Sequence, residues 1–219
     1  MKKVLLGLLL IAAVAFFGLR LVRTGETTAQ SLALQDVVSR VRDGDLIFQE
    51  SVSGQSKAIQ LATHSKYSHC GIVFMRDGKP FVFEAVQTVQ DTPLEEWIAR
   101  GVNGHFVVRR LKNSGQALTP EALAKMKKLA RTFEGKKYDL FFEWSDDRMY
   151  CSELAWKLYQ RSTGIEVGRL QKMADFDLSN PLVSAAIKKR YGDRFSPDLK
   201  VISPAEMLAS TLLETVVSN

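Results

Sequence analysis

The sequence predicts an α+β fold in which an antiparallel sheet packs on helices. Two observations carry this prediction: strand patterns cluster between residues 46 and 111, and amphipathic helix patterns dominate from residue 119 onward. The 219 residues, 46% hydrophobic and 25% charged, provide enough apolar material for one packed domain plus a targeting segment. This composition excludes wholesale disorder.

The strand predictions start after the Asp-Gly-Asp turn at residues 43–45, with an apolar run at 46–48. Residues 67–75 and 80–86 have strand patterns and are separated by a four-residue turn that contains Asp-Gly. Asp-Gly between two apolar runs is a strong signal for a β-hairpin. Residues 104–111 predict another strand.

Helices are predicted where capping residues precede apolar periodic segments and glycines follow them. The clearest example begins at Thr119-Pro120 and ends at Gly135, and a loop at residues 136–149 follows it. The predicted helices cover residues 31–42, 54–63, 93–100, 120–134, 150–163 and 181–191, with a last one starting at the Ser203-Pro204 capping box.

The first 30 residues are predicted to be a signal peptide or a signal-anchor, and residues 31–219 a single domain. Two lysines precede an apolar run at residues 4–22 that is interrupted by Arg20, close to the ~20 residues that a spanning helix needs. We therefore expect a periplasmic protein, exported or held at the inner membrane through residues 4–22. A buried core helix is the alternative interpretation of this run.

Charge and cysteine content exclude several classes of partner. The formal net charge is +6, but residues 1–30 contribute +3 of it, which leaves too little positive charge to predict a nucleic-acid partner. Two cysteines exclude a disulfide-rich scaffold, and the absence of a CxxC pair argues against structural zinc. A metal cluster drawn from His64, His69, Cys70 and Cys151 matches no common zinc spacing.

The predicted hairpin places a histidine near a carboxylate. If Asp77 and Gly78 form the turn, Gly71 lies opposite Glu84, on the same face as His69. Glu84 is then diagonal to His69, at a distance of ~7–8 Å that a long side chain can bridge, and Gly71 has no side chain to block the path. The register predicts a carboxylate that orients an imidazole; a surface histidine beside a solvated glutamate is the alternative.

Cys151 is the candidate nucleophile because it begins a predicted helix. The unpaired N–H groups and the positive end of the helix dipole stabilise a thiolate there, and the N–H of Cys151 could donate to an oxyanion. A buried core cysteine is the alternative. Cys70 adjoins His69, but successive strand residues point to opposite faces, so we expect Cys70 to pack in the core. A disulfide between Cys70 and Cys151 is a further possibility that would abolish catalysis.

Several motifs in the order found here resemble the permuted papain-like amidases of the YiiX type, in the NlpC-like cysteine peptidase superfamily. The resemblance covers about residues 41–210 and rests on DGDLIFQ, QSKAIQLATHSKYSHCGIVF, PFVFEAV, TPLEEWI, GKKYDLFFEWSDDRMYCSELAWKLY and FDLSNPL.

This resemblance implies a circularly permuted papain-like fold of the NlpC type, in which an antiparallel sheet or half-barrel packs on helices. It implies Cys151 of YCSE as the nucleophile, His69 of YSHCG as the base and Glu84 of VFEA as the residue that orients the base. It implies no metal and no organic cofactor. Tyr67 and Tyr150 are proposed as oxyanion donors or substrate contacts.

The expected function is an exported thiol hydrolase that cleaves an amide bond, in a cell-wall peptide or a related small amide, through a thioester. A lipid acyl hydrolase or acyltransferase with the same triad, acting on a lipid-like amide or ester, is one alternative. A membrane-tethered binding module without catalysis is another. The basic residues 188–190 are expected to form a solvated helix face, and residues 165–219 are a candidate cleft wall.

Overall fold

The computed structural model describes residues 34–219, which fall into two compact units divided between Arg40 and Val41. In the first unit, residues 34–40 are helical. The predicted signal or anchor segment at residues 1–30, and its boundary with the domain, lie outside the described residues. None of the helices within residues 34–219 combines the length and the apolar character that crossing a membrane requires.

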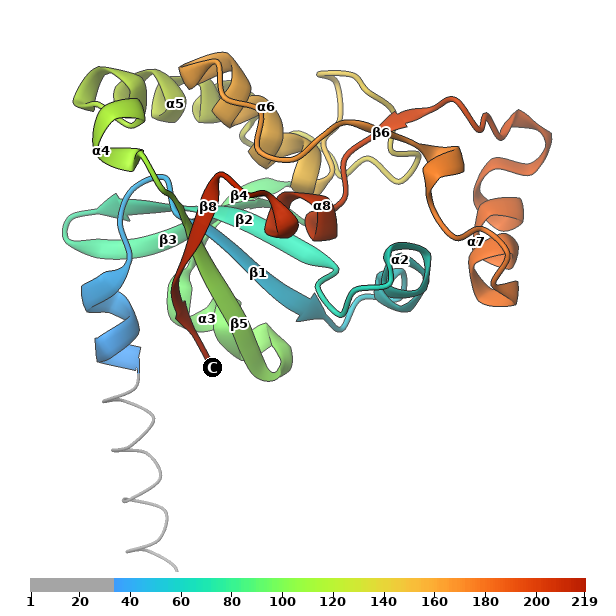
Figure 1. Ribbon diagram of the computed structural model, residues 1–219, viewed down its shortest axis with the longest axis horizontal. Helices are drawn as coiled ribbons and strands as arrows, with labels where there is room; N and C mark the ends of the chain where they lie inside the picture. The colour runs from blue at the N-terminus through green and yellow to red at the C-terminus, as the bar shows by residue number, and fades with distance from the viewer. Residues whose placement is uncertain (1–33) are drawn as a thin grey trace, which may run out of the picture. The chain divides into compact units, whose positions relative to one another are not determined.

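The second unit is built on a six-stranded antiparallel sheet with the strand order β4-β3-β2-β1-β5-β8 (Figure 1). Its strands are β1 (Leu46–Ser51), β2 (His69–Arg76), β3 (Lys79–Ala85), β4 (Val89–Pro93), β5 (Gly101–Leu111) and β8 (Leu213–Ser218). A separate antiparallel pair consists of β6 (Gln171–Lys172) and β7 (Lys200–Val201).

The helices of this unit are α2 (Ser56–Thr63), α3 (Leu94–Arg100), α4 (Ser114–Ala117), α5 (Pro120–Phe133), α6 (Cys151–Thr163), α7 (Pro181–Tyr191) and α8 (Pro204–Ala209), with the 3₁₀ turns η1 (Met173–Asp175) and η2 (Gly192–Arg194). Side chains cap three of them as the sequence predicts. Thr119, Asn180 and Ser203 each accept a hydrogen bond from a backbone N–H in the first turn that follows.

The two faces of the sheet contact different helices. On one face α6 packs on β2 and β3, and α5 packs on α6 (Figure 1). The core there includes Ile72, Phe83 and Leu158, all nearly inaccessible to solvent. On the other face α3 packs on β3, β4 and β5. The predicted combination of helices with an antiparallel sheet is confirmed.

Two strands of the sheet were not predicted from the sequence. β4 has a polar sequence that ends in Pro93. A proline is tolerated there because β4 lies at the edge of the sheet. β8 forms the other edge by pairing with β5, although about a hundred residues separate the two strands in the chain. The strands do cluster early in the chain, and β8 is the exception in this sheet, because pairing over such a separation leaves no local signal.

Candidate active site

The β2–β3 hairpin brings His69 and Glu84 into direct contact. Its register pairs Ile72 with Phe83, as predicted from the Asp-Gly turn. Nε2 of His69 lies 2.5 Å from Oε2 of Glu84. A Cβ atom at Gly71 would lie 2.4 Å from Val82 Cγ1 and 3.3 Å from Glu84 Cβ, so any larger residue at this position would disturb the pair.

Glu84 is completely buried, and its carboxylate accepts hydrogen bonds from several side chains besides His69. The donors are Thr92 Oγ1 at 2.6 Å, Trp97 Nε1 at 2.9 Å and Arg100 Nη2, which lies 2.6 Å from both oxygens. Burial alone would raise the pKa of Glu84, but His69 and Arg100 lower it to about 2. The carboxylate is therefore charged at any physiological pH.

The His69 ring is held between this carboxylate and an aromatic side chain. It stacks on Trp97 with 6.0 Å between ring centroids and 26° between planes, and it is 7% exposed. Burial lowers the pKa of His69, but the negative charge of Cys151 and the hydrogen bond to Glu84 outweigh burial and raise it to about 9. The imidazole is thus protonated at neutral pH when Cys151 is a thiolate.

Cys151 is the first residue of α6 and lines the same cavity as His69. The pKa of its thiol lies well below the usual range because the Cys70 thiol donates to its sulfur and His69 stabilises the negative charge, against an opposing effect of burial. The helix N-terminus favours the same charge. Together Cys151 and His69 form a thiolate–imidazolium pair.

Cys70 packs in the core as predicted, yet it also reaches the candidate nucleophile. It is completely buried beside Ile72 and Leu154, and burial together with Cys151 raises the pKa of its thiol. The expectation that Cys70 only faces away from the site is therefore incomplete. His69 and Cys70 both reach Cys151 because β2 begins at His69, next to the first turn of α6. Both cysteines are free thiols.

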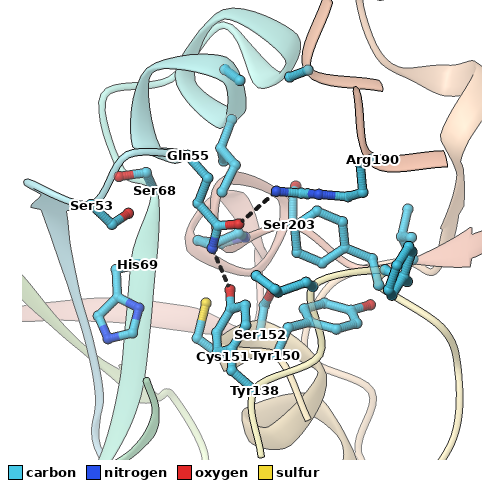
Figure 2. A pocket seen from close by; sticks show the side chains of 18 of the residues that line it. Ser53, Gln55, Ser68, His69, Tyr138, Tyr150, Cys151, Ser152, Arg190 and Ser203 are labelled. Carbon is cyan, nitrogen blue, oxygen red and sulfur yellow. Dashed lines mark hydrogen bonds between the residues drawn. The ribbon is translucent and has the colours of Figure 1, made fainter. Parts of the chain in front are cut away.

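A cavity of about 1140 Å³ opens in front of Cys151. One side, which we call the sheet wall, is formed by Ser51, Ser53, Ser68, His69, Ala85, Val86, Gln87 and Thr88. The opposite side, which we call the helix wall, is formed by Gln55, Ala58, Ile59 and Ala62 on or before α2, by Val183, Ala186, Ile187, Arg190 and Tyr191 on α7, and by Phe141, Phe142, Met173 and Phe176. Figure 2 shows His69, Ser53 and Ser68 on one side of Cys151 and Arg190 on the other.

A chain of hydrogen bonds crosses the cavity next to Cys151 (Figure 2). Arg190 Nη2 donates to Gln55 Oε1 at 3.1 Å, and Gln55 Nε2 donates to the Tyr138 hydroxyl oxygen at 2.8 Å. Burial and the charge on Cys151 raise the pKa of Tyr138 well above its usual range. The sequence analysis missed these three residues, although Tyr138 lies in the KYDLFF motif, because their proximity depends on segments far apart in the chain.

The two tyrosines proposed from the sequence lie in different places. Tyr150 lines the cavity, but its hydroxyl accepts a hydrogen bond from the Ile202 N–H at 3.1 Å and its ring packs edge-on against Phe142. Tyr67 packs beside the main core under the ammonium group of Lys66 and lies outside the cavity lining. The structure therefore does not bring Tyr67 into the site.

Residues 165–219, the candidate cleft wall of the sequence analysis, contribute many residues to the helix wall. Residues 188–190 were expected to form a solvated face of α7, but they differ in exposure. Lys188 is exposed, whereas Arg190 is half-buried in the cavity with its guanidinium 4.9 Å from the centre of the Phe142 ring. The prediction is wrong for Arg190, because the contact between α2 and α7 turns this side chain inward.

The geometry allows attack by a thiolate on an electrophilic carbon in the cavity. A sulfur anion, an imidazolium positioned by a carboxylate, and the N-terminus of α6 come together at the cavity. Within residues 34–219, no cluster of three or more histidine, cysteine, aspartate or glutamate side chains is placed to hold a metal ion.

The chain is similar in sequence and in structure to known proteins. The family described as "permuted papain-like amidase enzyme, YaeF/YiiX, C92 family" matches residues 40–217. The protein YiiX of Escherichia coli K12 is 50% identical over 176 residues, which is 80% of this chain and 86% of YiiX. A crystal structure described as the metalloprotein yiiX of Escherichia coli O157:H7 is 50% identical and matches with a TM-score of 0.78, over 82% of this chain and 98% of that one.

Proposed function

The chain belongs to the YaeF/YiiX family of permuted papain-like amidases, and from that premise we propose that it is a thiol hydrolase that cleaves an amide bond at Cys151. The observation that carries the proposal is that His69 contacts both Glu84 and Cys151, and that Cys151 and His69 line one cavity. Each of the three has the charge that amide cleavage requires.

In the first half of the reaction the Cys151 sulfur attacks the carbonyl carbon of the amide. The imidazolium of His69 then gives its proton to the leaving nitrogen as the C–N bond breaks, which leaves a thioester on Cys151. In the second half, His69 takes a proton from water and the hydroxide so formed attacks the thioester carbonyl. The C–S bond then breaks, which releases the carboxylic acid and restores the Cys151 thiolate beside the His69 imidazolium. The overall reaction consumes only the amide and one water molecule.

Glu84 keeps the His69 ring in one orientation throughout both steps. Its hydrogen bond fixes which nitrogen faces Cys151, and its negative charge stabilises the imidazolium. Arg100, Thr92 and Trp97 in turn hold the carboxylate, so we assign to them a positioning role.

Tyr138 supplies the second donor for the oxyanion that forms on the carbonyl oxygen, beside the N–H of Cys151. Because the hydroxyl oxygen accepts a hydrogen bond from Gln55 Nε2, its own proton can point at a substrate next to Cys151. Tyr138 thus has the role of oxyanion donor that the sequence analysis proposed for Tyr150 or Tyr67.

The remaining expectations stay proposals. Export to the periplasm depends on residues 1–30, and a cell-wall peptide as substrate depends on the family resemblance. The proposed chemistry is tested by labelling with iodoacetamide and mapping the modified peptides, with Cys151→Ala and His69→Ala on a panel of peptides and acyl amides. We expect labelling at Cys151 far above that at Cys70, and loss of cleavage in both variants. Equal turnover by Cys151→Ala and the natural chain would falsify the proposal.

A further inference from the structure

The two walls of the cavity differ in polarity, and Cys151 lies between them. The sheet wall presents hydroxyl and amide side chains, such as Ser53, Ser68 and Gln87, whereas the helix wall presents Phe141, Phe176 and other apolar groups. Its volume of about 1140 Å³ slightly exceeds the ~300–1,000 Å³ usual for small-molecule sites. A short peptide amide would leave the apolar helix wall uncovered.

We propose that the substrate is a long-chain N-acyl amino acid, an amphiphile whose acyl chain lies along the helix wall while the amino acid lies at the sheet wall. This inference rests on the proposed amide hydrolysis at Cys151 and names the substrate class for that site. Burial of an alkyl chain against apolar side chains supplies the binding free energy.

The direction of the substrate follows from the position of the proton donor. His69 must protonate the leaving nitrogen, so the amine half of the amide lies on the side of His69, which is the sheet wall. The acyl half then extends to the opposite side of Cys151, along the helix wall. The acyl chain therefore remains in the cavity as the thioester when the amino acid leaves.

An exposed apolar side chain in the cavity lining supports an amphiphilic ligand. Leu140 lines the cavity next to Phe141 and is 54% exposed. A large apolar side chain that is exposed within a binding cavity is suited to contact with an alkyl chain.

The charges of the cavity indicate an anionic ligand. Among the described residues, its lining includes no aspartate or glutamate and five cationic side chains, of which Arg100 already pairs with the buried Glu84: Arg100, Lys137, Arg148, Lys189 and Arg190. Lys137 is held beside the sheet wall by a backbone bridge to Thr88. The carboxylate of an amino acid bound at the sheet wall would lie near this ammonium group, which favours an N-acyl amino acid over a neutral amide.

The first test measures kcat/KM for N-acylglycines with chains of 2, 8, 12 and 16 carbons by quantifying released glycine. We expect kcat/KM to rise roughly twofold to fourfold for each methylene until the cavity is filled. After the reaction is quenched with acid, mass spectrometry of the intact protein should show the acyl chain, not glycine, attached to Cys151.

A matched pair of substitutions on α7 tests where the chain lies. Ala186 lines the cavity, whereas its neighbour Ala185 is exposed and outside the lining. Ala186→Phe should lower kcat/KM for the 16-carbon substrate at least tenfold while affecting acetylglycine less than threefold. Ala185→Phe should leave the whole series unchanged.

A second pair tests the carboxylate. Lys137→Glu should reduce kcat/KM for an acylglycine at least tenfold more than for the acyl ethylamide of the same chain length, which lacks the carboxylate. The control is Lys125→Glu at an exposed position of α5 outside the cavity lining, which should affect both substrates equally.

The outcomes separate this inference from the proposed function. Cleavage of acetylglycine and of cell-wall peptides at rates independent of chain length overturns the inference and leaves amide hydrolysis at Cys151 intact. No cleavage of any acylglycine, with Cys151 still labelled by iodoacetamide, also overturns it. If Cys151 is not labelled and no amide is cleaved, the proposed function fails together with the inference.

Discussion

The sheet wall and the helix wall of the cavity are held in place by different kinds of contact. Behind the sheet wall, the buried carboxylate of Glu84 accepts hydrogen bonds from four side chains, and one of them is His69 of the same hairpin. On the helix wall, half-buried apolar side chains from α2 and α7 meet, with one hydrogen bond between Gln55 and Arg190 joining them. The reaction requires a rigidly held His69, which the hydrogen bonds behind the sheet wall provide. The apolar contacts of the helix wall are compatible with substrate binding.

This difference predicts which kinetic constant each wall controls. Substitutions on the sheet wall should reduce kcat, because the oriented imidazolium acts in the transition state. Substitutions on the helix wall should act mainly through KM, because that wall contacts the part of the substrate that does not react.

Glu84→Gln should produce the largest effect among the changes that keep the nucleophile. The amide has nearly the same shape but carries no charge, so the imidazolium loses its stabilising partner and Arg100 loses its ion pair. We expect kcat to fall roughly 10³-fold with KM nearly unchanged.

The control for Glu84→Gln is Glu95→Gln at an exposed position of α3. Stopped-flow or steady-state kinetics on one amide substrate would measure both variants. A loss in Glu84→Gln confined to KM would contradict the division between the walls.

The same contrast explains what the sequence could predict. His69 and Glu84 are 15 positions apart in one hairpin, so an Asp-Gly turn and strand alternation sufficed to place them together. Cys151 was located by the start of a helix and by the family resemblance. Gln55 and Arg190 are 135 positions apart, and no local pattern fixes how α2 packs on α7. The same limit concealed β8, whose pairing partner lies about a hundred residues earlier.

Tyr138→Phe tests the point where the two walls meet. The phenol takes a hydrogen bond from the helix wall through Gln55 and offers its own proton beside Cys151. Removing one oxyanion donor should lower kcat roughly 10²-fold. Because the hydroxyl does not touch His69, the rate of iodoacetamide labelling at Cys151 should change little. A labelling rate that falls as much as kcat would assign Tyr138 to thiolate stabilisation instead.

The pH profile should report the charge state of the sheet wall. The pKa of His69 is raised to about 9, so the imidazolium is present below that pH and is lost as the pH rises through it. We expect kcat/KM to decline about tenfold per pH unit above about 9. Glu84 contributes to the raised pKa, so Glu84→Gln should move this alkaline limb to lower pH. A limb that stays at the same pH in this variant would show that another group titrates there.

Arg190→Met should have the smallest effect, and it should appear in KM. The substitution keeps an unbranched side chain beside the Phe142 ring but removes the guanidinium and its hydrogen bond to Gln55, which keeps its bond to Tyr138. The loss of one hydrogen bond predicts a change of about threefold to tenfold. Lys188→Met, exposed two positions earlier on α7, is the matched control. If Arg190→Met instead reduces kcat as strongly as Tyr138→Phe, the guanidinium orients the phenol through Gln55, and the helix wall belongs to the catalytic machinery as much as the sheet wall does.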